Sequence, residues 1–279
     1  MSEPVSIGAI PSLNALPLTA PLRAADPSRV RVVWDAPARL ADLLRRGELD
    51  LALVPQVELS RDPDYRFLPG RAIACDGAVE SILLFHHGPV EGLDRVEVDA
   101  ASRSSVELLR ILLHRRTGRT PEIVRTRDDF SPADLGGAPE RGLLCIGDRA
   151  LAARHHAVPR TDLGAWWREE TGLPFVFALW IGRAGLDPAV LAIAEEAARQ
   201  GARRRETIGR EFAAEHPEVI DGEGAARYLT DTLHHTCGER ELASIARFAQ
   251  ERREIGGAVP EGWQPLPFPP PRLPAEEES

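Results

Sequence analysis

The sequence contains no lysine, so all 34 of its basic residues are arginine. This absence excludes chemistry that needs a lysine amine, such as Schiff-base formation or proton abstraction by a lysine base. The arginines are outnumbered by 43 acidic residues, which gives a net charge of −9, and they form no segregated basic patch. Because such a surface repels phosphate groups, the sequence argues against a nucleic-acid-binding protein.

Cysteine is scarce as well, with three residues in the whole chain. Cys75, Cys145 and Cys237 are far apart, odd in number and never in the close spacing of a metal-binding or redox motif. We therefore expect three reduced thiols. The pair His155-His156 has no carboxylate or thiol at ligand spacing and reads as an exposed loop. On these grounds we expect neither a metal site nor a bound cofactor.

Long apolar runs are also missing from the chain. No stretch approaches the roughly 20 residues that span a membrane. The N-terminus lacks the basic region and apolar core that mark a secretory signal. We therefore expect a cytoplasmic protein with no membrane association. With 279 residues, 43% of them hydrophobic, the chain can bury a sizeable core in one large domain or two smaller ones.

Strand and helix patterns alternate along the chain, which is typical of an α/β protein. Strands are predicted at residues 5–10, 50–54, 79–86, 95–98, 122–126, 142–146 and 174–181. Helices are predicted at residues 36–46, 104–116, 162–170, 187–215, 223–236 and 239–254. The apolar run at 174–181 is almost unbroken, so this strand is buried on both faces, and we predict that it pairs with the strand at 79–86.

We interpret these two strands as crossovers between two lobes. This predicts a discontinuous first lobe of residues 1–84 and 181–264 and an inserted second lobe of residues 85–180, with a ligand cleft between them. Residues 265–279 are rich in proline and carry three consecutive glutamates. They cannot bury enough apolar surface to order themselves, so we predict a flexible tail.

Candidate ligand-binding residues follow the predicted strands, because ligands of open α/β sheets collect beyond the carboxyl ends of the strands. Asn14 lies in the loop after the first strand, where its amide can donate to and accept from a ligand. Spacing alone favours a structural role, in which the amide bonds its own backbone. Ser81 interrupts an apolar strand and fits a ligand donor and a core serine equally well.

Two further groups of polar residues belong to the predicted second lobe. Ser104 and Glu107 fit a capping box at the start of a helix, and that helix start, with its hydroxyls and Arg103, favours an anion pocket. Gly147 and Asp148 follow the buried strand at 142–146. Asp148 is favoured as the cap of a helix that starts at Arg149, although its position also lines the cleft.

Several short segments in the chain match a known family in the same order. They are Ser12-Leu13-Asn14-Ala15-Leu16-Pro17, Leu53-Val54-Pro55 with Glu58, Asp64-Tyr65-Arg66-Phe67-Leu68-Pro69-Gly70, Ser102-Arg103-Ser104-Ser105, Ile146-Gly147-Asp148 and Thr171-Gly172-Leu173-Pro174-Phe175-Val176-Phe177-Ala178-Leu179-Trp180. Together they resemble the chorismate dehydratases of the futalosine route to menaquinone, over about residues 5–255. The resemblance implies the two-lobed type II periplasmic-binding-protein fold and dehydration of chorismate to 3-[(1-carboxyvinyl)oxy]benzoate.

The resemblance also implies a site. Asn14 matches an active-site asparagine of the family, which reverses the structural interpretation given above. The residues expected to bind the substrate are Ser12, Ser81, Ser102, Arg103, Ser104, Ser105, Gly147 and Asp148. Because no general base is obvious, we hypothesise that the substrate's own side-chain carboxylate accepts the ring proton while Asn14 holds the geometry. Asp76 and Asp148 are fallback bases, and Arg39 and Glu58 are further candidates for the cleft.

Three other interpretations compete with this one. The first is the sister enzyme that makes 1,4-dihydroxy-6-naphthoate, although the catalytic histidine of that family has no matching cleft motif here. The second is a non-catalytic binding protein for a small anion, which would need an export signal. The third is a ligand-sensing domain of a transcriptional regulator, which would need a DNA-binding element before the first strand. The sequence leaves the oligomeric state open.

Overall fold

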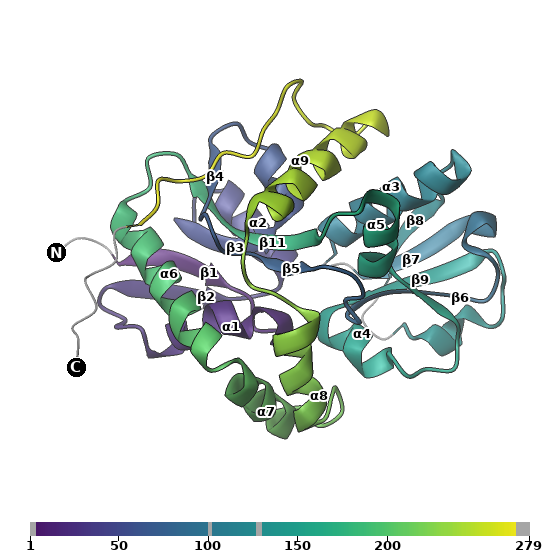
Figure 1. The fold of residues 1–279 in the computed structure, drawn as a ribbon, viewed down its shortest axis with the longest axis horizontal. Coiled ribbons are helices and arrows are strands. Elements are labelled where there is room, and N and C mark those ends of the chain that lie inside the picture. The colour runs from purple at the N-terminus through teal and green to yellow at the C-terminus, as the bar shows by residue number, and fades with distance from the viewer. Residues whose placement is uncertain (1–3, 100–101, 127–129, 272–279) are drawn as a thin grey trace.

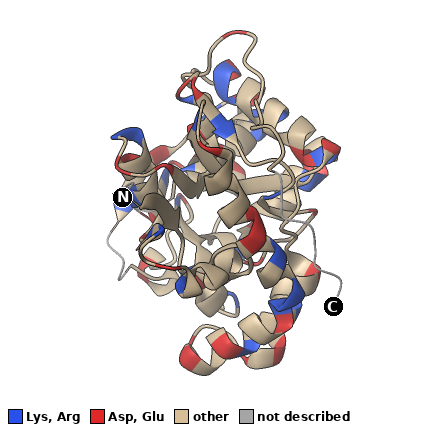
Figure 2. Cartoon of the chain, turned by 90° about the vertical axis from the view of Figure 1, so that its left-hand side faces the viewer, with Lys and Arg blue, Asp and Glu red and all other residues tan. Residues whose placement is uncertain are grey.

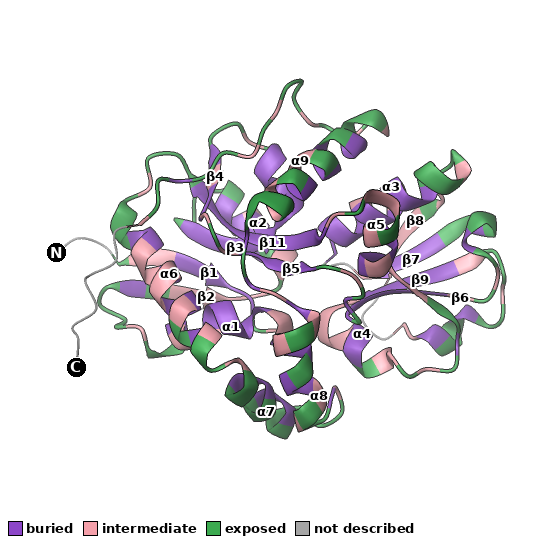
Figure 3. Ribbon diagram, viewed as in Figure 1, coloured by how far each residue is buried: buried purple, intermediate pink, exposed green. Residues whose placement is uncertain are grey.

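Two β-sheets, each flanked by helices, build two lobes that lie side by side (Figure 1). The computed structural model describes residues 4–99, 102–126 and 130–271. Buried residues concentrate along the strands of both sheets and on the helix faces that pack against them (Figure 3). The alternation of strands and helices predicted from the sequence is therefore confirmed as an α/β fold.

The first sheet holds six strands in the order β2-β1-β3-β11-β4, with β5 beside β11. Its members are β1 (Val5–Ala9), β2 (Val30–Trp34), β3 (Leu51–Pro55), β4 (Tyr65–Phe67), β5 (Ile73–Cys75) and β11 (Phe175–Arg183). β1 is parallel to β2 and β3, whereas β11 is antiparallel to β3, β4 and β5. β11 is buried except at its last residue, as its apolar run predicts.

The second sheet holds five strands in the order β10-β6-β9-β7-β8. Its members are β6 (Ile82–His86), β7 (Arg95–Asp99), β8 (Glu122–Thr126), β9 (Arg141–Ile146) and β10 (Arg160–Asp162). β7 runs parallel to both β8 and β9. The carboxyl ends of β7 and β9, at Asp99 and Ile146, therefore lie at one edge of the sheet, which faces the first lobe.

The helices are α1 (Leu16–Thr19), α2 (Pro37–Arg45), α3 (Ser104–Thr117), α4 (Gly147–Ala153), α5 (Leu163–Thr171), α6 (Pro188–Arg203), α7 (Arg205–Glu215), α8 (Gly222–Arg227) and α9 (Glu239–Glu254). The prediction of a single helix at 187–215 is wrong. The backbone of Arg204 has non-helical dihedral angles, so the segment forms two helices, α6 and α7. The helix predicted at 223–236 ends early, because α8 passes into a π-helical turn that stops at Thr232. No helix of the described residues combines the length and apolar composition that a bilayer crossing needs.

The predicted pairing of residues 79–86 with 174–181 is wrong. β6 pairs with β9 and β10, whereas β11 pairs with β3, β4 and β5, so the two strands belong to different sheets. Both are buried on both faces, and burial alone cannot distinguish one sheet from the other. If sheet membership defines the lobes, the two connections between them lie at residues 76–81 and 163–174.

One carboxylate ties the two connections together. Asp162 accepts hydrogen bonds from the backbone N–H groups of Val79 (3.0 Å) and Glu80 (2.7 Å) in the first connection. It also caps α5 by accepting from the N–H groups of Gly164 (2.9 Å) and Ala165 (3.1 Å). Glu80 has a φ of 61° and is the only non-glycine residue of the described chain with a positive φ. The bond from its N–H to Asp162 holds it in this costly conformation.

The start of the predicted C-terminal tail is ordered against the first sheet. Phe268 is 4% exposed, and its backbone N–H donates to the carbonyl of Phe67 in β4 at 2.9 Å. The prediction of a flexible tail from residue 265 is therefore wrong at its beginning, because one buried aromatic side chain and a strand-like contact fix it. Residues 272–279 lie outside the described chain. Arginine and acidic residues are interspersed along the same helices, as Figure 2 shows for one side of the molecule.

Candidate active site

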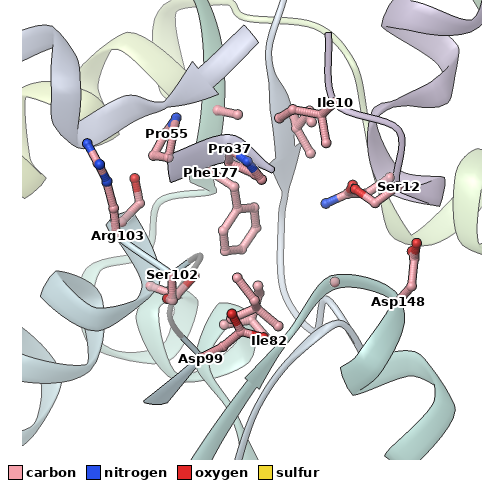
Figure 4. A pocket seen from close by; sticks show the side chains of 17 residues that line it. Ile10, Ser12, Pro37, Pro55, Ile82, Asp99, Ser102, Arg103, Asp148 and Phe177 are labelled. Carbon is pink, nitrogen blue, oxygen red and sulfur yellow. The ribbon is translucent and has the colours of Figure 1, made fainter. Parts of the chain in front are cut away.

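A cavity of about 200 Å³ lies where the two lobes meet (Figure 4). The first lobe contributes Ile10, Ser12, Asn14, Pro37, Pro55, Ile73, Phe177 and Ala178. The second contributes Ile82, Asp99, Ser102, Arg103, Ser104, Ser105, Ile146, Gly147 and Asp148. The polar residues come from the carboxyl ends of β1, β7 and β9 and from the segments that follow them, which is where an α/β sheet collects its ligand.

Every residue expected to form the site lines this cavity except one. The exception is Ser81, which is 1% exposed and whose hydroxyl accepts a hydrogen bond from the Tyr228 phenol at 2.6 Å. Ser81 is therefore a satisfied core serine in this structure and does not line the cavity, and its role in substrate binding stays a prediction. Its backbone carbonyl accepts from the N–H of Gly147 at 2.8 Å and so helps to place the start of α4.

Asn14 lies in the short 3₁₀ helix Leu13–Ala15 that follows β1. The hydroxyl of Ser12 donates to its Oδ1 at 2.8 Å. This bond orients the amide and leaves its NH₂ group as a donor for a ligand in the cavity. The backbone carbonyl of Asn14 is held separately, because Nε2 of His235 lies 2.8 Å from that oxygen.

His235 is a residue that the sequence interpretation missed. It is 4% exposed, and burial lowers its pKa to about 4, although the bond to Asn14 works in the opposite direction. The ring is therefore neutral near pH 7, and its N–H donates to the Asn14 carbonyl. Residue 234 pairs with Ala74 of β5, which brings this segment beside the first sheet. No local sequence signal marks a contact that depends on such a tertiary pairing.

Asp148 faces the Asn14 loop from the second lobe. It stands in the first turn of α4, which starts at Gly147, so the predicted capping role for a helix starting at Arg149 is wrong. Its Oδ1 accepts from the backbone N–H of Leu13 at 3.1 Å, which links the two lobes beside the cavity. Burial raises its pKa to about 6, and the bond from Leu13 offsets only part of that effect.

The segment at 102–105 lies at the start of α3, on the other side of the cavity in Figure 4. The predicted capping box is wrong, because Arg103 is the N-cap residue and no side chain caps the helix. The hydroxyl of Ser104 instead accepts from the backbone N–H of Val57 in the first lobe at 3.2 Å. The hydroxyl of Ser102 is buried and finds no partner among the described residues.

Two acidic residues differ from expectation. Asp99, at the carboxyl end of β7, lines the cavity, and its Oδ2 lies 3.6 Å from Nη1 of Arg149. It was not among the residues expected from the sequence. The fallback base Asp76 lies outside the cavity and is exposed. A hydrogen bond from Arg240 is the main cause that lowers the pKa of Asp76, and Arg168 adds to it.

The two remaining candidates do not line the cavity. Arg39 is exposed on α2. Glu58 is 3% exposed and lies just outside, where it forms an ion pair with Arg103 at 2.9 Å. Within the described residues, no group of three histidine, cysteine or acidic side chains is arranged to hold a metal ion. The described lining offers one amide, several hydroxyls, two carboxyls and a single basic side chain around an apolar centre that includes Phe177.

Known proteins are similar to this chain over most of its length. Residues 5–254 match the model of a family described as menaquinone biosynthesis. The chain is 34% identical over 243 residues to chorismate dehydratase from Thermus thermophilus, which covers 79% of this chain and 86% of that protein. It is 29% identical over 192 residues to 1,4-dihydroxy-6-naphtoate synthase from the same organism, covering 64% of this chain and 67% of that protein.

Solved structures support the fold. A protein of Archaeoglobus fulgidus superposes with a TM-score of 0.73 at 17% identity, covering 91% of this chain and 98% of that one. The periplasmic aliphatic sulphonate binding protein of Escherichia coli superposes with a TM-score of 0.57 at 18% identity, covering 98% and 96%. The predicted two-lobed type II periplasmic-binding-protein fold is thereby confirmed. The family model covers residues 5–254, and the chorismate dehydratase of Thermus thermophilus is 34% identical over 79% of the chain. The protein therefore belongs to the menaquinone biosynthesis family.

Proposed function

We propose that this protein is a chorismate dehydratase, a hydro-lyase that converts chorismate to 3-[(1-carboxyvinyl)oxy]benzoate in the cytoplasm. One observation carries the proposal. Asn14 and the hydroxyl-rich start of α3 converge from opposite lobes on one cavity in a chain related to such an enzyme. The three cysteines are free and buried, which suits a reducing compartment.

The cavity suits a small ring that carries two carboxylates. Its centre is apolar, with Ile10, Ile82 and Phe177 in the lining, and its polar groups lie toward the sides. The N-terminal turn of α3 presents free backbone N–H groups to an anion. Ser102 and Ser105 line the cavity at the same end. Neutral donors of this kind bind a carboxylate without a paired cation.

The chemistry demands little of the protein. The ether and hydroxyl of chorismate are trans, so the ring proton beside the ether and the departing hydroxyl share a face and leave most simply by syn elimination. Formation of the aromatic ring drives the reaction, and the ring carboxylate activates the proton through the diene. The protein supplies orientation, electrostatic stabilisation and exclusion of water.

We propose that the substrate's own side-chain carboxylate accepts the ring proton. Asn14 positions that carboxylate and the departing hydroxyl, because its amide can donate a hydrogen bond to both. The amide cannot itself take up a proton at neutral pH. No histidine lines the cavity within the described residues. Asp148 is the alternative proton acceptor, since it lines the cavity and its pKa lies near 6.

The test is to incubate the purified protein with chorismate, without added metal or cofactor, and to identify the product by chromatography and mass. The proposal expects the aromatic enol ether, and no turnover of a chorismate analogue that lacks the side-chain carboxylate. A parallel incubation with cyclised futalosine examines the sister reaction. Turnover of that compound alone would assign the protein to the sister activity, and binding of chorismate without product would leave a binding protein.

A further inference from the structure

Arg103 stands at the edge of the cavity but directs its charge away from it. Its Nη1 donates to Glu58 Oε1 at 2.9 Å, and its Nη2 forms an ion pair with Asp42 Oδ1, also at 2.9 Å. The Arg103 side chain is 14% exposed, and the Glu58 side chain is 4% exposed. Burial by itself lowers the pKa of Arg103, but the bonds to the two carboxylates outweigh it and raise that pKa.

These ion pairs join the two lobes. Arg103 precedes α3 in the second lobe, whereas Asp42 lies in α2 and Glu58 in the 3₁₀ helix Gln56–Ser60 of the first lobe. The hydrogen bond from the Val57 N–H to the Ser104 hydroxyl crosses at the same place. Paired and partly buried charges of this kind interact more strongly than exposed ones.

A second link between the lobes lies on the other side of the cavity, where the Leu13 N–H donates to Asp148. Figure 4 shows Arg103 and Asp148 at opposite sides of the space that Phe177 occupies. The cavity is thus bounded on two sides by polar contacts between lobes. The positive charge of Arg103 is already paired with two carboxylates, so it attracts the carboxylate of a ligand less than an unpaired arginine would.

We propose that Arg103 is a latch between the lobes, a positioning residue that holds the cleft closed through Asp42 and Glu58 and does not itself bind the substrate's carboxylate. This inference goes beyond the proposed reaction, because it concerns the contacts between the lobes and not the chemistry of the substrate. It also replaces the expectation that Arg103 binds substrate. The carboxylates of a ligand are then left to the hydroxyls and backbone N–H groups of the cavity.

The test is amide hydrogen exchange of the ligand-free protein, read at Leu13. This amide reports on closure because its partner Asp148 lies in the opposite lobe, and it is remote from Arg103. In Arg103→Ala we expect Leu13 to exchange at least about tenfold faster, because removing one partner of a buried pair strongly destabilises the closed contact. Amides inside β9 and β11 serve as internal references and keep their wild-type protection.

Two further variants separate the latch from other roles. Glu58→Gln neutralises one of the two first-lobe partners of Arg103 and should also accelerate exchange at Leu13. The double variant should exchange at Leu13 no faster than Arg103→Ala alone. Arg61→Ala is the matched control, because Arg61 pairs with the same Glu58 at 3.0 Å within the first lobe. It should leave Leu13 unchanged. If Arg103→Ala is unfolded, Glu58→Gln still decides the question.

Unchanged exchange at Leu13 in both Arg103→Ala and Glu58→Gln would overturn the latch. Equal acceleration in Arg61→Ala would overturn it as well, because the effect would then be local to Glu58. A loss of chorismate binding in Arg103→Ala, with wild-type exchange in the absence of ligand, would make Arg103 a substrate ligand instead. Because exchange is measured without substrate, failure of the proposed reaction would leave this result standing.

Discussion

The Nε2 atom of His235 lies 2.8 Å from the backbone carbonyl oxygen of Asn14, although 221 residues separate them in the chain. The histidine thereby fixes the backbone that carries the proposed catalytic amide. Replacing His235 with alanine removes this donor. We expect kcat to fall by about 10- to 100-fold with a smaller change in KM, because misplacing a catalytic group by an ångström costs rates of that order.

The matched variant is His235→Gln, whose amide nitrogen lies near the position of Nε2. It should recover a substantial part of kcat if the lost hydrogen bond is the cause. Steady-state kinetics of the three proteins make the comparison. An equal loss of kcat in both variants, or a change in KM alone, would refute a positioning role for His235.

The same histidine should make stability depend on pH. Its folded pKa of about 4 lies below the ordinary value of 6.5, so the unfolded chain binds a proton in a range where the folded protein does not. Stability is then fully present above about pH 6.5 and is lost as pH falls toward 4. Between pH 7.5 and 5 this amounts to roughly 2 kcal/mol.

Denaturant unfolding of wild type and His235→Gln at several pH values measures this contribution. The free-energy difference between the two proteins should shrink as pH falls, because glutamine does not titrate. A difference that stays constant from pH 7.5 to 5 would show that His235 titrates normally.

Asp148 should make the folded protein less stable as the pH rises, which is the opposite of the effect of His235. Its folded pKa of about 6 lies above the ordinary value of 3.8, so the folded protein holds a proton that the unfolded chain has already released. The charged form costs stability above about pH 6, and this cost disappears below about pH 4. Asp148→Asn should therefore be more stable than wild type at pH 8, by up to about 3 kcal/mol, while its amide oxygen still accepts from Leu13.

The same variant distinguishes the two proton acceptors. If the substrate's carboxylate takes the ring proton, Asp148→Asn keeps most of its activity at pH 8. If Asp148 is the base, the variant is inactive, and the kcat/KM of wild type falls as pH drops through 6. Initial rates of both proteins between pH 5 and 8.5 separate these outcomes.

Ser81 and Tyr228 form a buried pair outside the cavity. Ser81→Ala leaves the Tyr228 phenol without its acceptor, which should cost about 1–3 kcal/mol of unfolding free energy. Activity of the folded protein should stay near wild type. The double variant Ser81→Ala with Tyr228→Phe should regain part of the stability, because both partners are then gone. A large loss of kcat in Ser81→Ala would return Ser81 to the site.

The positions of several cavity residues could be predicted because they follow strands, whereas the role of Asn14 came from the family resemblance, since spacing alone favours a structural role. Asn14, the only asparagine of the chain, comes after β1, and Gly147 and Asp148 come after β9. The carboxyl end of a strand is recognisable from an apolar run, and the fold gathers such ends at one place. The same argument applied to the end of β7 would have selected Asp99.

Other features could not be predicted, because they depend on contacts between distant segments. β6 and β11 read alike from sequence, since both are buried on two faces, yet they lie in different sheets. Ser104 has the spacing of a helix cap, but its hydroxyl is taken by Val57 of the other lobe. His235 sits in a stretch with a helical pattern, and only its pairing beside β5 brings it to Asn14.

The most direct measurement compares wild type with Asn14→Ala at saturating chorismate, with substrate binding followed separately by calorimetry. The account predicts that wild type forms the aromatic enol ether, and that Asn14→Ala still binds chorismate but loses at least about 100-fold in kcat, because the amide acts chiefly in the transition state. Wild-type turnover in Asn14→Ala, or no product from wild type, would contradict it.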